Sequence, residues 1–234
     1  MRILAIDTSL GAGSVAAVDD EGSAVRPLGP HREHARVLAA ALLEVAQARG
    51  WQCGGSAVAA ADIVAVVRGP GSFTGLRVGV ATAKSLAWAT GARLVGVSGF
   101  EVVARRSAAA TSWSDGSIEV AFDAGHGDVY AATVAHVGGQ WRIAEPVLTS
   151  LGLWVAALPP GAHVTGPALA VCGDRLAARG DLAVALPEVW HPTAEEAAHA
   201  ARARAAASDF DDPRTLVPEY LRPSYAEEPR RPGG

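Results

Sequence analysis

Apolar and polar positions alternate in blocks over the first hundred residues, and the blocks switch between strand-like and helix-like spacing. Short apolar runs predict strands at residues 3–6, 14–18, 23–28, 62–67 and 93–97, and apolar positions three or four residues apart predict helices over 33–50 and 74–89. The run 62–67 is mostly β-branched, which is typical of a parallel strand buried on both faces. Strands and helices in this order predict an α/β fold with a mixed sheet.

The second half of the chain repeats the opening arrangement. The segments ending at Asp7 and Asp123 lie 116 positions apart, and a glycine-containing turn and a second strand follow each of them. Further along, the pattern predicts a strand over 140–148 and helices over 151–157, 169–178 and 193–207. A duplication of half-length units predicts two similar subdomains with mixed sheets, facing each other across a cleft.

Composition marks the boundaries between these units. We expect an N-terminal subdomain over 1–106, a linker over 107–116 that is rich in Ser, Ala and Thr, and a C-terminal subdomain over 117–210. Residues 211–234 contain five prolines in 24 positions, so we expect a tail that crosses back over the molecule or frays.

The charge balance limits what the chain can bind unaided. The 234 residues carry a net charge of −4 and Lys84 is the only lysine, so we expect no basic footprint for an RNA backbone. Cys53 and Cys172 lack the spacing of a metal site, and His31 and His34, at a helix start, have no third ligand nearby. No apolar window approaches 18 residues. We therefore expect a cytoplasmic protein without a membrane span, metal or cofactor.

Two glycine-containing turns that each follow an aspartate are the first candidate site. Glycine lets backbone N–H groups approach a phosphate, and an aspartate can orient a hydrated cation, so the pair could clamp a nucleotide. The alternative is that each aspartate caps its own turn by accepting backbone N–H bonds. The absence of a GxxxxGKS run, and of a basic residue beside either turn in the sequence, favours capping. The candidate nucleotide-site residues are Asp7, Ser9, Gly11, Gly13, Asp123 and Gly125.

The run from Gly69 to Arg77, GPGSFTGLR, is the most unusual stretch of the chain. It joins a buried strand to a helix and places hydroxyl groups at the helix N-terminus, where they can cap free N–H groups or where an anion can bind. Small residues recur along that helix, at Gly79, Ala81, Ala83 and Ala87. They indicate close approach of another helix, within the fold or on a partner.

Three sets of residues, in family order, resemble the bacterial TsaB (YeaZ) family: 3–9, 68–79 with 83–87, and 218–222. The resemblance implies a duplicated ribonuclease-H-like fold of the actin-like ATPase superfamily. It also implies a role in making threonylcarbamoyladenosine next to the anticodon of tRNAs. In that pathway the related subunit TsaD carries the transferase chemistry and its metal, TsaB is its non-catalytic partner, and the ATPase TsaE joins the assembly. The resemblance thus implies that tRNA is reached only through the complex.

The resemblance also implies where partners bind. The helices beginning near residues 33 and 74 would form the surface shared by a TsaB homodimer and by the TsaB–TsaD pair. The expected interface residues are His34, Leu38, Leu42, Phe73, Arg77, Val80 and Lys84.

Two details of this sequence bear on the implied role. The TsaD branch carries a metal-binding HxxxH pair after the corresponding helix and strand, whereas residues 98–104 here contain no histidine. The family usually has an arginine after the second aspartate-alanine pair, and Gly125 and His126 stand there instead.

The alternative function is an enzyme. A Mg-dependent nucleotide-binding ATPase or kinase-like protein would use the hairpins at Asp7 and Asp123 and would bind ATP with metal on its own. A scaffold subunit would show no turnover alone and would bind a TsaD-like chain.

Overall fold

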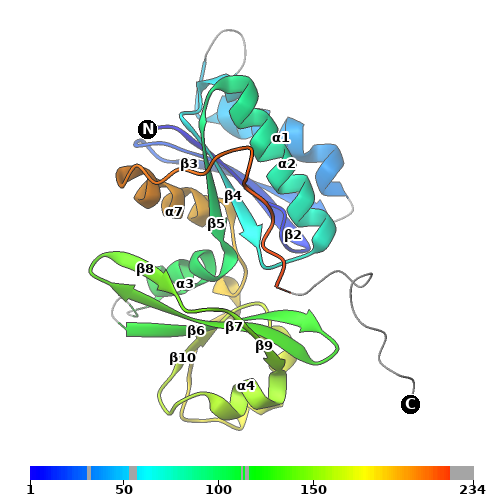
Figure 1. Ribbon diagram of the computed structural model, residues 1–234, viewed down its shortest axis with the longest axis vertical. Helices are drawn as coiled ribbons and strands as arrows, with labels where there is room; N and C mark the ends of the chain where they lie inside the picture. Colours follow the sequence, from blue (N-terminus) through cyan, green and yellow to red (C-terminus); the bar gives the residue numbers. More distant parts are fainter. Residues whose placement is uncertain (31–32, 53–56, 112, 114–115, 222–234) are drawn as a thin grey trace.

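Two mixed β-sheets, one above the other in Figure 1, form the framework of the chain. This computed structural model describes residues 1–30, 33–52, 57–111, 113 and 116–221. The first sheet has the order β3-β2-β1-β4-β5 and the second the order β11-β10-β6-β7-β8, with β9 paired to β7. We call the first sheet and the helices packed on it the first lobe, and the second sheet with its helices the second lobe.

The first sheet has a parallel half and an antiparallel half. Its strands are β1 (Ile3–Asp7), β2 (Ala12–Val18), β3 (Ser23–Pro30), β4 (Ile63–Gly69) and β5 (Arg93–Ser98). Strands β1, β4 and β5 run parallel, and β2 lies antiparallel to both β1 and β3. The helices of this lobe are α1 (His34–Ala48), the short η2 (Ala57–Ala60), α2 (Phe73–Thr90) and α7 (Ala194–Ala206). The five strands and helices α1 and α2 match the predicted order, whereas η2 was not predicted.

Strand β1 serves two hydrophobic cores at once. Every residue of the strand is buried, and successive side chains point to opposite faces of the sheet. Leu4 and Ile6 pack with α1 and α2, whereas Ile3 and Ala5 pack with α7. Helices therefore cover both faces of the first sheet, which explains why its central strands are apolar throughout.

Helix α7 belongs to the first lobe, although the sequence pattern places residues 117–210 in the second subdomain. Five of its alanines are buried in the core that contains Ile3 and Ala5 of β1. Alanine side chains let the helix axis approach the sheet closely, but they give a weak amphipathic signal. This is why sequence alone assigned α7 to the wrong lobe. The buried alanines are Ala194, Ala197, Ala198, Ala200 and Ala201.

The second lobe repeats the topology of the first. Its strands are β6 (Gly116–Gly125), β7 (Asp128–Val137), β8 (Gln140–Ile143), β9 (Val147–Ser150), β10 (His163–Thr165) and β11 (Ala183–Val184). Read from β8, the order β8-β7-β6-β10-β11 has the same parallel and antiparallel pairings as β3-β2-β1-β4-β5. Its helices are α4 (Leu151–Ala157), α5 (Leu169–Cys172), α6 (Asp174–Ala177) and the short η3 (Pro187–Val189). The expected duplicated ribonuclease-H-like, actin-like ATPase fold is confirmed.

Several second-lobe elements differ from the predicted ones. The strand expected over 140–148 is split into β8 and β9 around Pro146, which has no N–H to donate to a ladder. The helix expected over 169–178 is interrupted at Gly173, which has a positive φ of 45°. Strands β10 and β11 contain three and two residues, too few to show a period.

Helix α3 (Gly99–Ala110) joins the two lobes and was not predicted. It includes residues 107–110 of the expected linker, and Ser107 Oγ is 2.7 Å from Thr165 Oγ1 of β10 in a buried hydrogen bond. The rings of Phe100 and Phe122 of β6 meet edge to face, with centroids 5.1 Å apart. Arg105 donates from Nε to Glu196 Oε1 of α7 at 2.9 Å. A packed helix, rather than an unstructured linker, therefore connects the two sheets.

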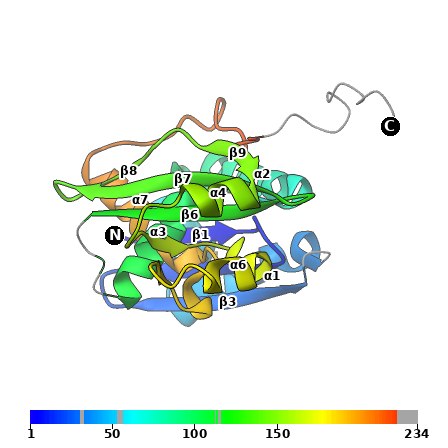
Figure 2. The ribbon, with the colours of Figure 1, turned by 90° about the horizontal axis from the view of Figure 1, so that it is seen from below.

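Residues 211–221, which we call the C-terminal strap, return from α7 across the first lobe, as Figures 1 and 2 both show. Asp211 pairs with Leu94 of β5, and Leu216 is buried in the core beneath α1 and α2. Glu219 donates its backbone N–H to the Arg68 carbonyl of β4 at 2.7 Å. Leu221 packs against the second-lobe core. This part of the expected tail crosses back, and 222–234 lie outside the described residues.

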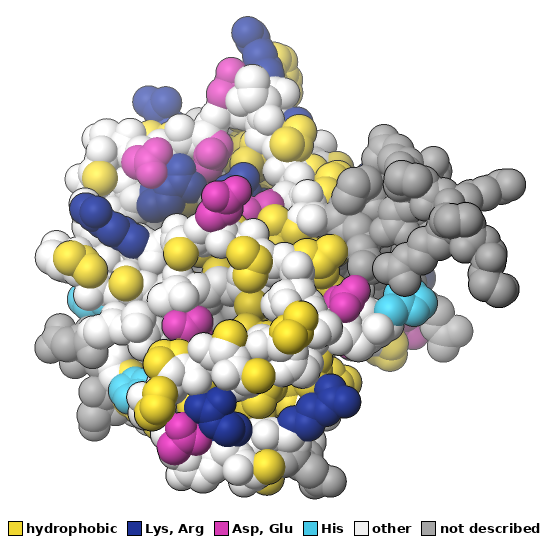
Figure 3. Space-filling view, turned by 60° about the horizontal axis from the view of Figure 1, so that its bottom comes forward, with side chains coloured by type: hydrophobic (Ala, Val, Ile, Leu, Met, Phe, Trp, Pro, Cys, Tyr) yellow, Lys and Arg dark blue, Asp and Glu magenta, His cyan; other side chains and the backbone are white. Residues whose placement is uncertain are grey.

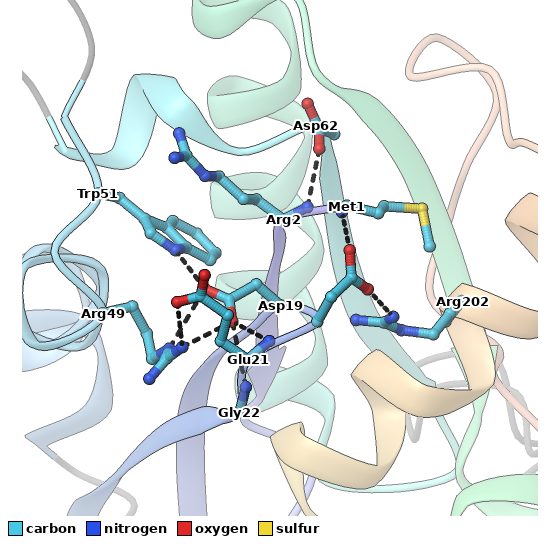
Figure 4. A network of polar contacts seen from close by, with 10 residues as sticks. Met1, Arg2, Asp19, Glu21, Gly22, Arg49, Trp51, Asp62 and Arg202 are labelled. Carbon is cyan, nitrogen blue, oxygen red and sulfur yellow. Dashed lines mark hydrogen bonds and ion pairs between the residues drawn. The ribbon is translucent and has the colours of Figure 1, made fainter.

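Figure 4 shows a polar network that holds the β2–β3 turn against α1 and α7. The Asp19 carboxylate accepts hydrogen bonds from Arg49 Nη2 at 2.6 Å and from Trp51 Nε1 at 2.8 Å. The Arg49 hydrogen bond holds the pKa of Asp19 well below its ordinary value. The neighbouring Asp20 binds the chain's N-terminal amine and Arg202 of α7. Because Trp51 is almost completely buried, Asp19 satisfies an indole N–H that lies beyond the reach of bulk water.

We expect Asp19→Asn to destabilise the fold in a pH-dependent way. Loss of the charged hydrogen bonds should lower the free energy of unfolding by about 1–3 kcal/mol at pH 7. The pKa of Asp19 is depressed in the folded state, so its stabilisation is present above the unfolded pKa of about 3.9 and is lost as the pH falls below that value. Urea unfolding at pH 7 and pH 3 measures both effects.

The exposed neighbour Glu21 supplies the control. Its carboxylate is 3.9 Å from Arg49 and open to solvent, so Glu21→Gln should change stability by less than about 0.5 kcal/mol. A difference between wild type and Asp19→Asn that grows on acidification would contradict the assignment.

Candidate functional site

The β1–β2 turn is closed on itself. Asp7 and Ser9 are buried, and Asp7 Oδ1 accepts bonds from Ser9 N at 2.9 Å and Ser9 Oγ at 2.6 Å. Burial raises the pKa of Asp7, and the bonds from Ser9 partly oppose that shift. A Cβ added at Gly13 would lie 2.7 Å from both the Asp7 carbonyl and His34 Cε1. Of the four candidate residues in this turn only Gly11 is exposed, so the geometry favours capping over a phosphate cradle.

The β6–β7 turn is different because it opens onto a cavity. Asp123 is exposed, and its Oδ1 accepts the Gly125 N–H at 2.8 Å. Beside it lies a cavity of about 520 Å³ that His126 and Arg175 of α6 also line. Sequence reasoning missed Arg175 because it lies far from Asp123 along the chain, and only the fold brings the two to one cavity. The two hairpins therefore do not form a symmetric clamp.

Cys172 also lines this cavity but is a poor nucleophile. Burial raises the pKa of its thiol to about 11, so the thiolate is scarce at neutral pH. Within the described ranges, no group of three or more His, Cys, Asp and Glu residues is placed to hold a metal ion. His31 and Cys53, named above, lie outside those ranges.

The GPGSFTGLR run locks α2 against the β1–β2 turn. Ser72 donates its N–H to the Ser9 carbonyl at 2.7 Å, and Ser72 Oγ caps α2 by accepting the Gly75 N–H. A Cβ at Gly71 would collide with the Ser9 carbonyl, and a Cβ at Gly79 would collide with Thr8 Oγ1. The glycines of this motif therefore permit contact between two backbone segments, which accounts for the motif without a bound anion.

Four of the seven expected interface residues are almost completely buried within the chain itself. His34, Leu38, Leu42 and Val80 are each no more than 3% exposed. The last three pack into the chain's own core with α1 and α2, and His34 Nε2 lies 3.0 Å from the Gly29 carbonyl. The resemblance indicated the two helices but not their faces, and Leu38, Leu42 and Val80 lie mainly on the faces turned to the sheet.

The small residues of α2 also face inward. Gly79, Ala83 and Ala87 are buried, and only Ala81 is exposed. The close approach they indicate is between α2 and its own sheet, not between α2 and a partner helix.

Phe73, Arg77 and Lys84, the remaining expected interface residues, lie at the surface of α2. The Arg77 guanidinium carbon is 3.6 Å from the Phe73 ring centroid, and Nε donates to Tyr220 Oη of the strap at 2.9 Å. The rings of Phe73 and Tyr220 are 5.2 Å apart. Lys84 is half-buried and donates to the Leu216 carbonyl at 3.0 Å. These three residues therefore connect α2 to the strap.

An apolar groove lies between the outer faces of α1 and α2. It encloses about 230 Å³, and Leu43 of α1, which is 38% exposed, stands on its wall. Sequence reasoning missed this groove, although an exposed leucine between buried helical positions is a signal of it. The lining residues are Ala39, Leu42, Leu43, Val58, Thr82 and Leu86.

Comparisons with known proteins agree with one another. A family model described as TsaD, tRNA N6-adenosine threonylcarbamoyltransferase, matches residues 18–209. The tRNA threonylcarbamoyladenosine biosynthesis protein TsaB of Bacillus subtilis (strain 168) is 31% identical over 172 residues, which are 70% of this chain and 71% of that protein. The protein of that name from Escherichia coli (strain K12) is 35% identical over 136 residues, 56% of this chain and 54% of that protein.

A solved structure extends the likeness to both lobes. YeaZ from Pseudomonas aeruginosa matches with a TM-score of 0.76 at 25% identity, and the match covers 94% of this chain and 99% of that one. None of the helices in the described part of this chain is long and apolar enough to cross a membrane.

The capping role of Asp7 predicts opposite results for two substitutions. Asparagine can accept both bonds from Ser9 without a buried charge, so Asp7→Asn should keep or raise the melting temperature at pH 7. Asp7→Ala leaves the Ser9 N–H and hydroxyl without their acceptor and should cost about 1–3 kcal/mol. Thermal unfolding of the two variants beside wild type measures this.

The pH dependence has a definite sign. Because burial raises the folded-state pKa of Asp7, wild type loses stability as the pH rises from the unfolded pKa of about 3.9 towards the folded value. The advantage of Asp7→Asn should therefore be larger at pH 7 than at pH 4. Equal destabilisation by Asn and Ala would rule out capping as the role of this carboxyl.

Proposed function

The chain belongs to the TsaB (YeaZ) family, and we propose that it is a non-catalytic subunit that binds and activates a TsaD-like transferase. The reaction it serves is threonylcarbamoyl transfer to the adenosine next to the anticodon in tRNA. Both curated relatives carry the name of a tRNA threonylcarbamoyladenosine biosynthesis protein.

The observation that carries the proposal is the apolar groove between α1 and α2. Helical partners dock by inserting apolar side chains into such a groove, at positions three or four residues apart. The groove volume of about 230 Å³ suits one or two such side chains, and the exposed Leu43 adds apolar area at its edge. A helix pair of a TsaD-like subunit is the partner we assign to it.

The candidate chemical groups support a non-catalytic role. Asp7 is buried and engaged by its own turn, and the Cys172 thiol is protonated at neutral pH. A buried carboxyl whose Oδ1 already accepts two bonds from its own turn is poorly placed to bind a cation or activate a nucleophile. In this proposal the transferase chemistry and its metal belong to the TsaD-like subunit.

The remaining partners follow from the same assignment. Figure 3 shows basic and acidic side chains interspersed on the face it draws, without an extended area of positive charge. An RNA backbone needs many cationic contacts, so in this proposal tRNA is held through the complex in the cytoplasm. A TsaE-like ATPase joins the larger assembly, and the chain alone forms homodimers through the same groove.

We expect one-to-one binding to the TsaD-like subunit from the same genome, and we expect Leu43→Glu to weaken it at least tenfold. A carboxylate at the groove wall would have to lose its hydration on docking. Titration calorimetry gives the dissociation constant, and threonylcarbamoyl transfer with and without this chain gives the activation.

Leu153→Glu is the matched control, because Leu153 is an exposed leucine on α4 of the other lobe. Its dissociation constant should stay within about twofold of wild type. No complex between two folded wild-type proteins, or transferase turnover by this chain alone, would overturn the proposal.

The cavity beside Asp123 favours a second candidate function, nucleotide binding by the chain itself. Arg175 places a positive charge where a phosphate could bind, and the cavity is within the usual size range of ligand pockets. Against this, the first hairpin is buried, so one half of a nucleotide clamp is missing.

Titration of the folded chain with Mg-ATP separates the two functions, and we expect no binding heat. Saturable binding that Arg175→Ala abolishes and Asp7→Asn preserves would instead establish a one-sided nucleotide site at the β6–β7 turn.

A further inference from the structure

The α2 helix and the C-terminal strap together form a surface that the groove between α1 and α2 does not include. The strap lies antiparallel to α2, since Tyr220 contacts the first turns of α2 and Pro213 and Arg214 lie beside its last turns. The contacts span the helix from Phe73 to Trp88, roughly 22 Å at 1.5 Å per residue. We call this the α2–strap surface, formed by Phe73, Arg77, Lys84, Trp88, Arg214, Val217 and Tyr220.

Large apolar side chains on this surface remain in water. Trp88 is 75% exposed and Val217 is 61% exposed, and Phe73 and Tyr220 are each more than 40% exposed. Trp88 stands over a cavity of about 350 Å³ shared with Lys84 and Arg214. Several exposed apolar side chains this close together, along the contact between α2 and the strap, are typical of an interaction site.

The positive charges of this surface form no ion pairs with other described residues. Many arginines of the chain have an acidic partner, as Arg49 has Asp19 and Arg204 has Asp209. Arg77, Lys84 and Arg214 form no ion pair with any residue in the described ranges. Arg77 and Lys84 instead donate to neutral oxygens of the strap.

Two acidic residues of the strap lie close to this surface without neutralising it. Asp212 caps its own turn by accepting the Arg214 backbone N–H at 2.8 Å, and Glu219 lies 3.9 Å from Arg68 of β4. The surface therefore combines a net positive charge with exposed Trp, Phe, Tyr and Val side chains, on a chain that is acidic overall.

We infer that the α2–strap surface binds an acidic protein segment that also carries apolar side chains, supplied by the same TsaD-like subunit that fills the groove between α1 and α2. Tryptophan, tyrosine and arginine are the residues most often responsible for affinity at protein interfaces, and this surface presents all three. The choice of partner rests on the proposed function, while the acidic and apolar character of the segment rests on the surface itself.

A protein segment fits these observations better than RNA. Val217 offers no face for base stacking, and three cations over such a length supply few phosphate contacts. The half-buried Lys84 is also committed to the Leu216 carbonyl. Apolar burial combined with a few charge pairs is the expected composition of a protein interface.

Two exposed positions test the inference without disturbing the core. We expect Arg214→Glu to weaken the complex with the TsaD-like subunit at least fivefold and to flatten its dependence on NaCl between 50 and 500 mM, because a rim charge acts through long-range attraction. Trp88→Ser should weaken the complex at least tenfold at every salt concentration. Titration calorimetry with the full-length proteins measures both.

The controls are an exposed arginine and an exposed leucine of the second lobe. Arg142→Glu makes the same charge change on β8, and Leu153→Ser removes a similar apolar area on α4. Both should leave the affinity within about twofold of wild type, and equal melting temperatures for all four variants show that folding is intact.

The outcomes separate this inference from the proposed function. A wild-type complex whose affinity is unchanged by Arg214→Glu and Trp88→Ser overturns the inference and leaves the proposed function standing. No wild-type complex overturns both. Unchanged subunit affinity with weaker tRNA binding by the assembled complex would make the surface a nucleic-acid contact and overturn the assignment of a protein segment.

Discussion

The close approach of two backbone segments, the β1–β2 turn and the loop that begins α2, fixes the geometry of the first lobe. Gly71 and Gly79 have no Cβ to separate Ser9 and Thr8 from α2, and the Ser72 N–H bonds directly to the Ser9 carbonyl. Any side chain at either glycine would push α2 away from the sheet. The position of α2 then determines where the groove beside α1 lies and where the strap can run.

The two halves of the duplicated fold differ in the surroundings of their aspartates. Both halves present an aspartate at the end of a central strand, yet Asp7 is buried inside its turn and Asp123 opens onto a cavity with Arg175. Dehydration of the first carboxylate costs free energy that its turn bonds partly offset, which suits a rigid support better than an exchangeable ligand. The proposed activity instead uses exposed apolar side chains on the outward faces of α1, α2 and the strap, so it lies in surfaces rather than in a cleft.

The sequence predicted the elements whose local residue pattern is enough to define them. The β-branched run of β4 and the Ser72 cap of α2 each define local structure, and the repeated strand–aspartate–turn unit indicated the duplication. The sequence could not predict features that depend on distances in the folded chain or on which way a side chain points. The alanine face of α7 fits either lobe, and Arg175 comes to the same cavity as Asp123 only in the folded chain. The resemblance indicated which helices bind partners but not which of their faces, and Leu38 and Val80 are buried.

The first lobe is completed by the far end of the chain. Helix α7 covers one face of its sheet and Leu216 of the strap fills its other core, although 100 residues or so separate them from β5. On the ribosome, β1 and β4 therefore emerge long before α7 and the strap. The apolar face that α7 covers stays exposed while the entire second lobe is synthesised. Because β1 is made first, the N-terminal sheet stays incompletely covered for the longest part of synthesis, and it is the part most in need of shielding while the chain is being made.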